Sequence, residues 1–504
     1  FPRLFFYVGT FATAPFFVKK IIWGRIDKIL VLLRRYMKGR IMKVFLGFII
    51  YILIFSSLPY IRQKEISPKY KRNFNIDKFY KADGSLAYAK IIRDNDQARI
   101  EKIRAIDNAK DKIRIGSYRL VVDESCKTYM ASLLEAAKRG VDIEIILDGN
   151  TLFTNSGKNN YFLALESFPN VHIKIYNPMN LLKPWSLMGR MHDKYMIVDD
   201  NKAFLGGRNI EDRFFKTEGK FTYDWDVLIY YKKRSENDAL KQLENYFNNI
   251  YINGQRNKDV KDAAIFANDK KNNLLISELE SIYKEDKKSN PANYRPINYE
   301  QNLTKVGKIS LIANPVNVYS KEPVAFYEIT ELMKNADKSV SIHTPYVIAN
   351  NFIFENLEDI SGNAPTTLFT NSPDTGANTA GVGDYIIHEK KLRTMDIKLL
   401  ENEKPQSYHG KAFAIDDNIS AIGSFNWDMR SVYIDTELML VIEGEDFSNE
   451  ARNEFAFYED DATRVLSNGE RVNLSDRKIS KASFVKKFLA VLFTILFYPL
   501  RFLF

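Results

Sequence analysis

The sequence predicts an α/β protein built from two copies of one domain, and three observations lead to this prediction. Residues 112–149 have the pattern of a strand, a helix and a second strand, and residues 328–372 repeat an alternation of helices and strands. The motif H-x-K-x4-D occurs at residues 192–199 and again at residues 409–416. One motif in each α/β segment indicates an internal duplication.

The positive charge of the chain lies mainly at its two ends. The 504 residues carry a formal net charge of +10, with +9 in residues 1–43, +6 in residues 477–504 and −5 in the rest. A groove that follows nucleic-acid phosphates would carry its basic residues within the folded domains, so we expect no nucleic-acid partner. Basic ends suit an anionic membrane surface instead.

Both ends are also apolar. Residues 44–60 form an uncharged run near the lower length limit for a membrane-spanning helix, and residues 4–17 form a weaker run. No small-residue cleavage site stands out, so we expect residues 1–60 to be a basic region with an uncleaved anchor. For residues 484–504 we expect a membrane-associated helix, with a helix buried on the domain as the alternative.

The charge around this anchor bears on its orientation in a cell membrane. The excess of Lys and Arg before residue 44 favours a cytoplasmic N-terminus and an extracytoplasmic catalytic part. Basic residues between positions 62 and 72 weaken that inference. The lone Cys126 cannot form an internal disulfide, and no clustered His or C-x-x-C pair suggests a metal site, so we expect no cofactor.

The first domain is expected over residues 85–254 and the second over residues 307–478. In the first, a β-rich run precedes a helix that ends at Gly140, and a buried-type strand follows. Residues 255–306 are rich in Lys, Asn and Asp, which is typical of a linker, with one short helix. The second domain repeats helix and strand in alternation.

Each H-x-K motif is expected to open a β-hairpin. Residues two apart on a strand face the same side, so His192 and Lys194 project together. With a two-residue turn at residues 200–201, Lys194 lies opposite Gly207 and His192 opposite Asn209.

The second motif has the same geometry. With a turn at residues 417–418, Lys411 lies opposite Ser424 and His409 opposite Asn426. The lysine charge and the Asn and Ser donors suit the non-bridging oxygens of a phosphate. A neutral histidine suits nucleophilic attack or proton transfer.

Each histidine needs a carboxylate to hold its other ring nitrogen. We expect Glu437 to orient His409 and Asp226 to orient His192, with Asp224 as a weaker candidate for His192. The motif aspartates are an odd number of residues from the lysines, so they should point away from this patch and serve the hairpins. These two are Asp199 and Asp416.

At residues 192–209, HDKYMIVDDNKAFLGGRN, and 409–426, HGKAFAIDDNISAIGSFN, the sequence resembles the phospholipase D superfamily. The stretches GGRNIEDRFF, GSFNWDMRS and TELMLVIEG resemble bacterial cardiolipin synthases, closest to their C-type branch. The resemblance covers about residues 85–478. Residues 371–392 occupy the place of a family segment that helps shape the substrate entrance, and they depart from the family pattern there.

The resemblance implies two αβα sandwich domains that form one active site at their interface. It also implies metal-free phosphatidyl transfer in two steps, with His192 as nucleophile and His409 as acid and base. The reverse assignment stays open because the two patches are nearly symmetric. The catalytic motif residues are His192, Lys194, Asp199, His409, Lys411 and Asp416, and the phosphate-binding residues are Asn209, Gly207, Ser424 and Asn426.

Four functions follow from this reading. The first is a membrane-bound phosphatidyltransferase that makes cardiolipin from phosphatidylglycerol, and the second is a phospholipase D that releases phosphatidic acid. A nuclease of the same superfamily is disfavoured by the acidic middle of the chain and by its apolar ends. A non-catalytic scaffold is disfavoured by two intact His/Lys pairs.

Overall fold

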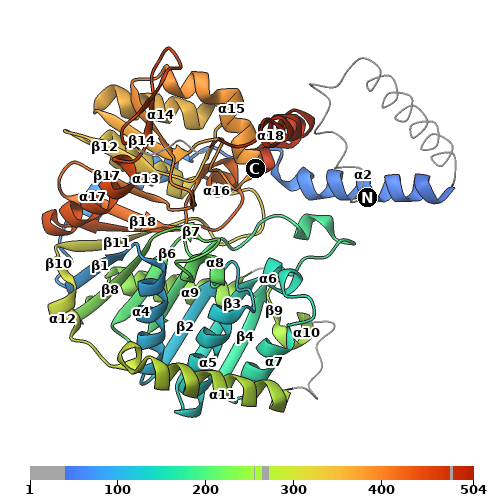
Figure 1. The fold of residues 1–504 in the computed structure, drawn as a ribbon, viewed down its shortest axis with the longest axis vertical. Helices are drawn as coiled ribbons and strands as arrows, with labels where there is room; N and C mark the ends of the chain where they lie inside the picture. The colour runs from blue at the N-terminus through green and yellow to red at the C-terminus, as the bar shows by residue number, and fades with distance from the viewer. Residues whose placement is uncertain (1–39, 255, 264–271, 477–480) are drawn as a thin grey trace.

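The computed structural model describes residues 40–254, 256–263, 272–476 and 481–504 (Figure 1). The apolar run at residues 4–17 and most of the basic N-terminal region lie outside this part of the chain. The described chain forms two similar halves, one above the other in Figure 1, and the apolar helix α2 projects from one side.

The first half contains a nine-stranded sheet in the order β10-β1-β8-β6-β5-β2-β3-β4-β9. β2, β3 and β4 run parallel, whereas β5, β6, β8 and β1 pair antiparallel. Its strands are β1 (Leu86–Ile92), β2 (Lys112–Ser117), β3 (Asp142–Asp148), β4 (Val171–Tyr176), β5 (Lys194–Val198), β6 (Lys202–Gly206), β8 (Asp226–Lys233), β9 (Lys258–Asp259) and β10 (Thr304–Val306).

The second half contains a sheet of the same size in the order β11-β20-β18-β17-β12-β14-β15-β21-β22. Its seven first strands follow the order of β1-β8-β6-β5-β2-β3-β4, which confirms the duplicated α/β fold. Its strands are β11 (Lys308–Ala313), β12 (Val340–His343), β14 (Thr366–Asn371), β15 (Ile397–Asn402), β17 (Ala412–Ile415), β18 (Ile419–Gly423), β20 (Leu438–Glu443), β21 (Thr463–Val465) and β22 (Arg471–Asn473).

Helices cover the outer faces of both sheets and also lie at the centre. The principal helices are α4 (Asn95–Asp107), α5 (Glu124–Lys138), α7 (Asn160–Glu166), α9 (Ala239–Asn253), α11 (Asn272–Ser289), α13 (Val324–Lys334), α14 (Asn351–Asn363), α15 (Thr379–Arg393) and α17 (Glu445–Glu459). Shorter ones are α3 (Pro68–Asn73), α6 (Gly149–Thr154), α8 (Asp212–Phe215), α10 (Val260–Ala263), α12 (Tyr299–Asn302) and α16 (Met429–Tyr433).

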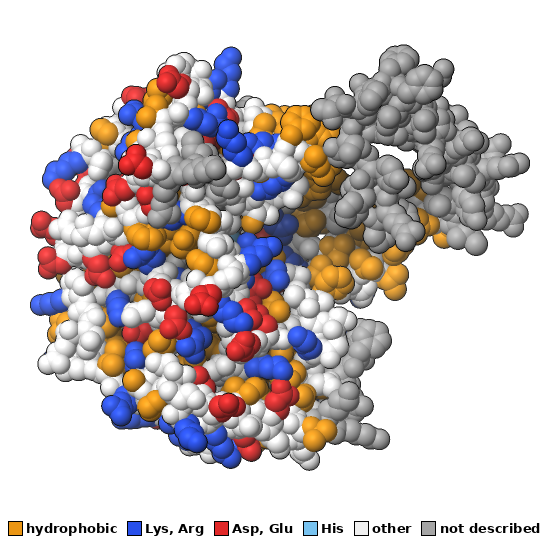
Figure 2. Space-filling view, in the orientation of Figure 1, with side chains coloured by type: hydrophobic (Ala, Val, Ile, Leu, Met, Phe, Trp, Pro, Cys, Tyr) orange, Lys and Arg blue, Asp and Glu red, His pale blue; other side chains and the backbone are white. Residues whose placement is uncertain are grey.

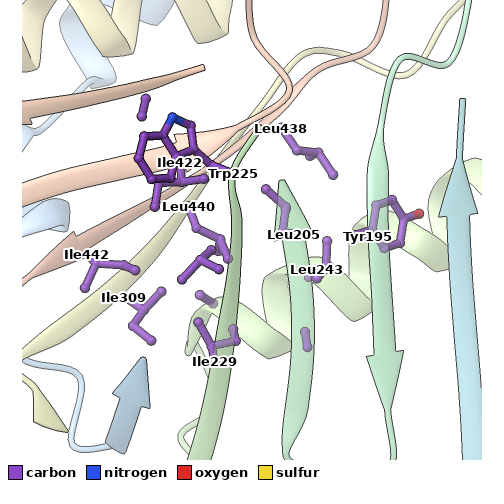
Figure 3. Close-up of a cluster of buried hydrophobic side chains, with 14 of the residues drawn as sticks. Tyr195, Leu205, Trp225, Ile229, Leu243, Ile309, Ile422, Leu438, Leu440 and Ile442 are labelled. Carbon is purple, nitrogen blue, oxygen red and sulfur yellow. The ribbon is translucent and has the colours of Figure 1, made fainter. Parts of the chain in front are cut away.

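One hydrophobic core joins the two halves. It contains strand residues from both sheets together with the apolar faces of α9 and α17. Figure 3 shows Leu205 and Ile229 of the first sheet close to Ile422 and Leu440 of the second. Because this core is continuous across the interface, burial of apolar area holds the halves in a fixed relation. One further core lies under the outer helices of each half.

The hairpins that carry the motifs differ from the predicted register by one residue. Val198 pairs with Lys202 and Ile415 pairs with Ile419, so each loop has three residues rather than two. The first loop residue is left-handed in both hairpins, with φ of 52° at Asp199 and 48° at Asp416. Aspartate tolerates this conformation, and the left-handed residue lengthens the turn.

Both motif aspartates fix their hairpins to the rest of the sheet. The Asp199 carboxylate accepts hydrogen bonds from the backbone N–H groups of Lys110 and Asp111, at 3.0 and 2.9 Å. The Asp416 carboxylate accepts them from Lys338 and other residues of the turn before β12. Their role in the structure is to connect loops, away from the two histidines.

The described residues of the segment 255–306, predicted as a linker, are part of the first half. β9 pairs with β4, and β10 pairs with β1 at the opposite edge of the same sheet. Between them, α11 packs against α5 and α7 and buries Leu279 fully. Apolar residues on one face of this otherwise polar helix explain why it docks.

Two apolar helices lie on the same side of the molecule. α2 (Arg40–Ser57) is the one described helix long and apolar enough to cross a membrane, with a mean hydropathy of 1.8 over residues 43–60. α18 (Phe484–Leu496) packs on α15, where Gly383 touches Ala490 and Thr494 closely. Its other face is exposed and apolar, so α18 is both docked on the domain and open to an apolar phase.

The end of α2 is fixed to both halves. The Tyr51 hydroxyl donates to the Leu182 carbonyl over 3.0 Å in the first half. After α2, the buried Tyr60 donates to the Val318 carbonyl over 2.5 Å in the second half. Gly189 packs against this pair, where a side chain would collide with Val318 and Tyr60. The apolar helix is therefore joined to the folded part by one exposed and one buried hydrogen bond.

Candidate active site

His192 and His409 line one cavity of about 260 Å³ between the two halves. His192 lies just before β5 and His409 just before β17, which are equivalent strands of the two sheets. The two copies of the motif therefore place their imidazoles at the same cavity, as the resemblance implies.

His192 is held by the opposite half of the molecule. Its backbone N–H donates to the Thr436 carbonyl over 3.2 Å, and its Nδ1 lies 2.9 Å from Oε1 of Glu437. The hydroxyls of Ser424 and Ser431 donate to the same carboxylate at 2.5 and 2.6 Å. The Nδ1–H group of His192 can therefore donate a hydrogen bond to Glu437, which leaves Nε2 free for chemistry.

His409 is held in the same crossed manner. Its backbone N–H donates to the Tyr223 carbonyl over 2.7 Å, and its Nδ1 lies 2.7 Å from Oδ2 of Asp224. The short parallel pair β7 (Thr222–Tyr223) and β16 (Ser407–Tyr408) brings these segments together. Each half therefore supplies the carboxylate for the histidine of the other.

The predicted orienting residues are corrected by this geometry. Glu437 contacts His192 rather than His409, and the weaker candidate Asp224 contacts His409. Asp226 contacts neither histidine, because its carboxylate forms a buried ion pair with Lys102 and lies 3.6 Å from Arg208. Sequence distance gives no sign of this crossing, since each pair belongs to different domains.

Both motif lysines lie beside their histidines. Lys194 and Lys411 are buried, and each ammonium group donates to the backbone carbonyl of its own histidine. Burial lowers the pKa of Lys194 to about 8 and that of Lys411 to about 7, against the attraction of the carboxylates at the site. Two cations held in this manner suit an anionic ligand.

The two motif asparagines are buried at equivalent positions. Asn209 lines the cavity, and the side-chain oxygens of Asn209 and Asn426 have no hydrogen-bond partner among the described residues. An unsatisfied buried amide oxygen costs free energy, so a ligand hydroxyl that donated a hydrogen bond to it would be favoured, while the amide N–H groups are donors for ligand oxygens.

The predicted phosphate-binding roles of Gly207 and Ser424 are not what the geometry indicates. A side chain at Gly207 would overlap the Asp224 carboxylate, so glycine makes room for that carboxylate. Ser424 is fully buried, and its hydroxyl donates to Glu437. Both residues act on the carboxylates that orient the histidines.

Burial and charge keep both histidines neutral. The pKa of His192 is well below its ordinary value because of burial and because of the Lys194 charge. Burial and Lys411 lower the pKa of His409 to about 3, against the opposing effect of Asp224. For Glu437, burial raises the pKa to about 8, while Lys194 and the serine hydrogen bonds lower it. A neutral imidazole is the form that can attack phosphorus.

Aromatic residues that the sequence reading did not identify complete the walls. Tyr118 contacts the His192 ring with centroids 4.9 Å apart, and Phe214 contacts the His409 ring at 5.2 Å. Tyr118 and Tyr346 both line the cavity, just beyond the equivalent strands β2 and β12. A Tyr within three residues of the end of each strand is the signal that could have identified them.

Residues 371–392 form one wall of the cavity. Asn378 and Gly381, at the start of α15, line it, and so does Tyr385 one turn further on. The helix therefore touches the cavity and carries α18 as well. His343 lies away from it, buried between the rings of Phe369 and Phe455.

The described residues contain no cluster of three or more His, Cys, Asp or Glu that could hold a metal ion. The polar side chains that line the cavity are instead two histidines, several amides, two arginines and one carboxylate, and they include His192, His409, Asn209, Arg119, Arg213 and Glu211.

Comparisons with known proteins agree with this arrangement. Residues 103–251 and 329–458 match the family described as "Cardiolipin synthase, PLD-like domain", where PLD denotes phospholipase D. Cardiolipin synthase C of Escherichia coli K12 is 24% identical over 443 residues, which cover 77% of this chain and 88% of that protein. An uncharacterized protein of Helicobacter pylori J99 is 26% identical over 400 residues, covering 72% and 77%.

The fold is also that of a solved enzyme. The crystal structure of a phosphatidylserine synthase from Haemophilus influenzae superposes with a TM-score of 0.58 at 12% identity. The match covers 84% of this chain and 98% of the other, so both halves and their relative placement take part.

Proposed function

We propose, because this chain belongs to the cardiolipin synthase, phospholipase D-like domain family, that it transfers phosphatidyl groups between phospholipids and makes cardiolipin from phosphatidylglycerol. The observation that carries the proposal is the crossed arrangement of the site. Two neutral histidines share one cavity, and each is backed by a carboxylate from the other half.

In the first step, Nε2 of His192 attacks the phosphorus of one phosphatidylglycerol. A phosphorus–nitrogen bond forms, the bond from phosphorus to the headgroup glycerol breaks, and His409 gives that glycerol its proton. The negative diester raises the pKa of the nearby His409, which favours the protonated form that this step needs. Lys194, Lys411 and the motif asparagines hold the non-bridging oxygens.

In the second step, His409 takes a proton from a glycerol hydroxyl of a second phosphatidylglycerol. That oxygen attacks phosphorus, the bond to His192 breaks, and cardiolipin leaves. Proton and phosphatidyl group are both balanced over the cycle, so no cofactor is needed. The reverse assignment, with His409 as nucleophile, exchanges the roles of two nearly symmetric sites.

The surface beside the cavity favours a lipid as acceptor over water. Hydrophobic side chains gather on the side where α2 and α18 lie (Figure 2). On α18 these include Phe484, Phe488 and Leu496, all exposed. An opening at the bilayer surface concentrates the lipid acceptor and reduces water at the site.

We also propose that α2 spans the cell membrane and that the catalytic part lies outside the cytoplasm. The support is the apolar span together with the +9 charge of residues 1–43. In a Cys126→Ser background, a cysteine in place of the exposed Glu236 should react with an impermeant maleimide in intact spheroplasts. Labelling only after lysis would reverse the orientation.

The function is tested with the full-length protein in mixed micelles of phosphatidylglycerol with EDTA, and products are followed by mass spectrometry. We expect cardiolipin and glycerol, and their loss in both His192→Ala and His409→Ala. Phosphatidic acid alone would identify a phospholipase D. Cleavage of DNA without lipid turnover would bring forward a nuclease.

A further inference from the structure

Two arginines reach the cavity from the first half of the molecule. Arg119 follows Tyr118 in sequence and Arg213 precedes Phe214, and these are the two rings that touch the histidines. Their segments lie side by side, because the backbone N–H of Ile210 donates to the Arg119 carbonyl over 3.1 Å. The positive groups are therefore close to both reacting side chains.

The duplicated halves treat their equivalent arginines differently. In the second half, Nε of Arg430 donates to the Asp435 carboxylate over 3.1 Å. In the first half, Nε of Arg213 donates to the Thr222 hydroxyl over 2.5 Å. Each arginine lies four residues after its motif asparagine, and Asp435 and Thr222 each lie two residues before an orienting carboxylate. The arginine of the second half therefore has a charged partner, Asp435, whereas the arginine of the first half has a neutral one, Thr222.

Because of this difference, Arg213 shares the nearby Glu211 carboxylate with Arg119 and has no charged partner of its own among the described residues. Among the described residues, Arg213 forms no ion pair, whereas Arg119 is paired with Glu211 at 3.2 Å. The neighbouring Asp212 pairs with Lys216 at 2.9 Å instead. The two arginines and one carboxylate at this wall of the cavity therefore carry a net positive charge.

We propose that Arg213, assisted by Arg119, binds the phosphodiester of the acceptor phospholipid and selects it over neutral acceptors. This inference rests on the proposed function. The donor phosphate occupies the histidines and lysines, yet an acceptor phosphatidylglycerol brings a second anionic diester, one glycerol away from its attacking hydroxyl. A planar guanidinium binds such a group through two parallel hydrogen bonds. Water and simple alcohols have no phosphodiester for the guanidinium to bind.

The test compares two soluble acceptors that end in the same glycerol group. Glycerophosphoglycerol carries a phosphodiester, and deuterated glycerol does not. With full-length protein and phosphatidylglycerol as donor, Arg213→Gln should lower transfer to glycerophosphoglycerol about tenfold or more, since a charge-assisted contact is lost. Transfer to glycerol should change less than about twofold.

A second variant neutralises Arg213 without removing it. Thr222→Asp recreates the pairing of Arg430 with Asp435 and should give the same selective loss, while Thr222→Ser should not. Arg295→Gln, an exposed arginine away from the cavity, is the matched control.

Equal losses with both acceptors would overturn the inference, because they would indicate a role in donor binding or in folding. Unchanged transfer in both variants would overturn it as well. A wild-type protein that transfers to neither acceptor would instead contradict the proposed transferase activity itself, so the two failures are distinguishable.

Discussion

Glu437 lies 2.9 Å from Nδ1 of His192, although the two residues belong to opposite halves of the molecule. Asp224 and His409 form the mirror relationship at 2.7 Å. Each imidazole is therefore correctly oriented only when the two halves are in register with each other.

Glu437→Gln should lower lipid turnover about tenfold to a hundredfold, because an amide cannot fix the tautomer of His192 as a carboxylate does. The measurement is the rate of product formation by mass spectrometry. Asp226→Asn is the control. It should keep the rate of the folded protein but lower its thermal stability, since Lys102 and Arg208 lose a buried carboxylate. A loss of turnover in Asp226→Asn with an unchanged rate in Glu437→Gln would instead indicate that Asp226 orients His192.

With an acyl-labelled phosphatidyl p-nitrophenol donor, whose leaving group needs no proton, His409→Ala should trap a phosphatidylated enzyme, because the acceptor hydroxyl of the second step loses its base. We expect an acid-labile label on His192, found by peptide mass spectrometry. His192→Ala should give no label. A label on His409 in the His192→Ala variant would exchange the two roles.

The two site histidines should remain neutral at pH 5–8, because burial and the lysine charges lower their pKa values, to about 3 for His409. Removing a nearby positive charge favours the imidazolium form, so Lys411→Met should raise the pKa of His409. The chain has five histidines, so the ring signals in ¹³C-histidine NMR can be assigned by substitution. A titration midpoint near pH 6.5 for the ring signals of His192 or His409 in the wild-type protein would contradict this prediction. Lys338→Met, at an exposed site, is the control.

Gly383→Val should loosen α18 from α15, because the new side chain would overlap the Ala490 carbonyl and the Thr494 hydroxyl. Overpacking of this kind costs about 1–3 kcal/mol. We expect a lower melting temperature and faster proteolysis around residue 483. Gly362→Ala, at an open position near the end of α14, should leave the proteolysis rate unchanged and the melting temperature unchanged or slightly higher. Equal melting temperatures would indicate that α18 contributes little to the fold.

The fold was predictable because its signals are local. The alternation of strand and helix around α5 and the spacing of the H-x-K motifs depend on neighbouring residues. The hairpin register was not predictable to one residue, because the left-handed conformation of Asp199 and Asp416 depends on the backbone groups they cap across the sheet. A two-residue turn is an equally good local solution.

The site was predictable in its members but not in all its partners. His192, His409 and the lysines follow from the repeat, whereas the exchange of Glu437 and Asp224 depends on how two separate sheets meet. The packing of the described part of residues 255–306 on the first half was not predictable for a related reason. A polar composition suggests a linker, but Leu279 and its apolar neighbours on α11 suffice to dock that helix.

The buried contact between Tyr60 and Val318, against Gly189, has a geometric consequence. Only two residues separate Gly189 from His192, so the segment that follows α2 and the His192 side chain belong to one rigid block. With α2 in a bilayer, the reactive nitrogen sits at a constant height above that bilayer. On the proposed function, phosphatidyl transfer would then take place in cis, and we expect lipids of a neighbouring vesicle to stay beyond reach of the site.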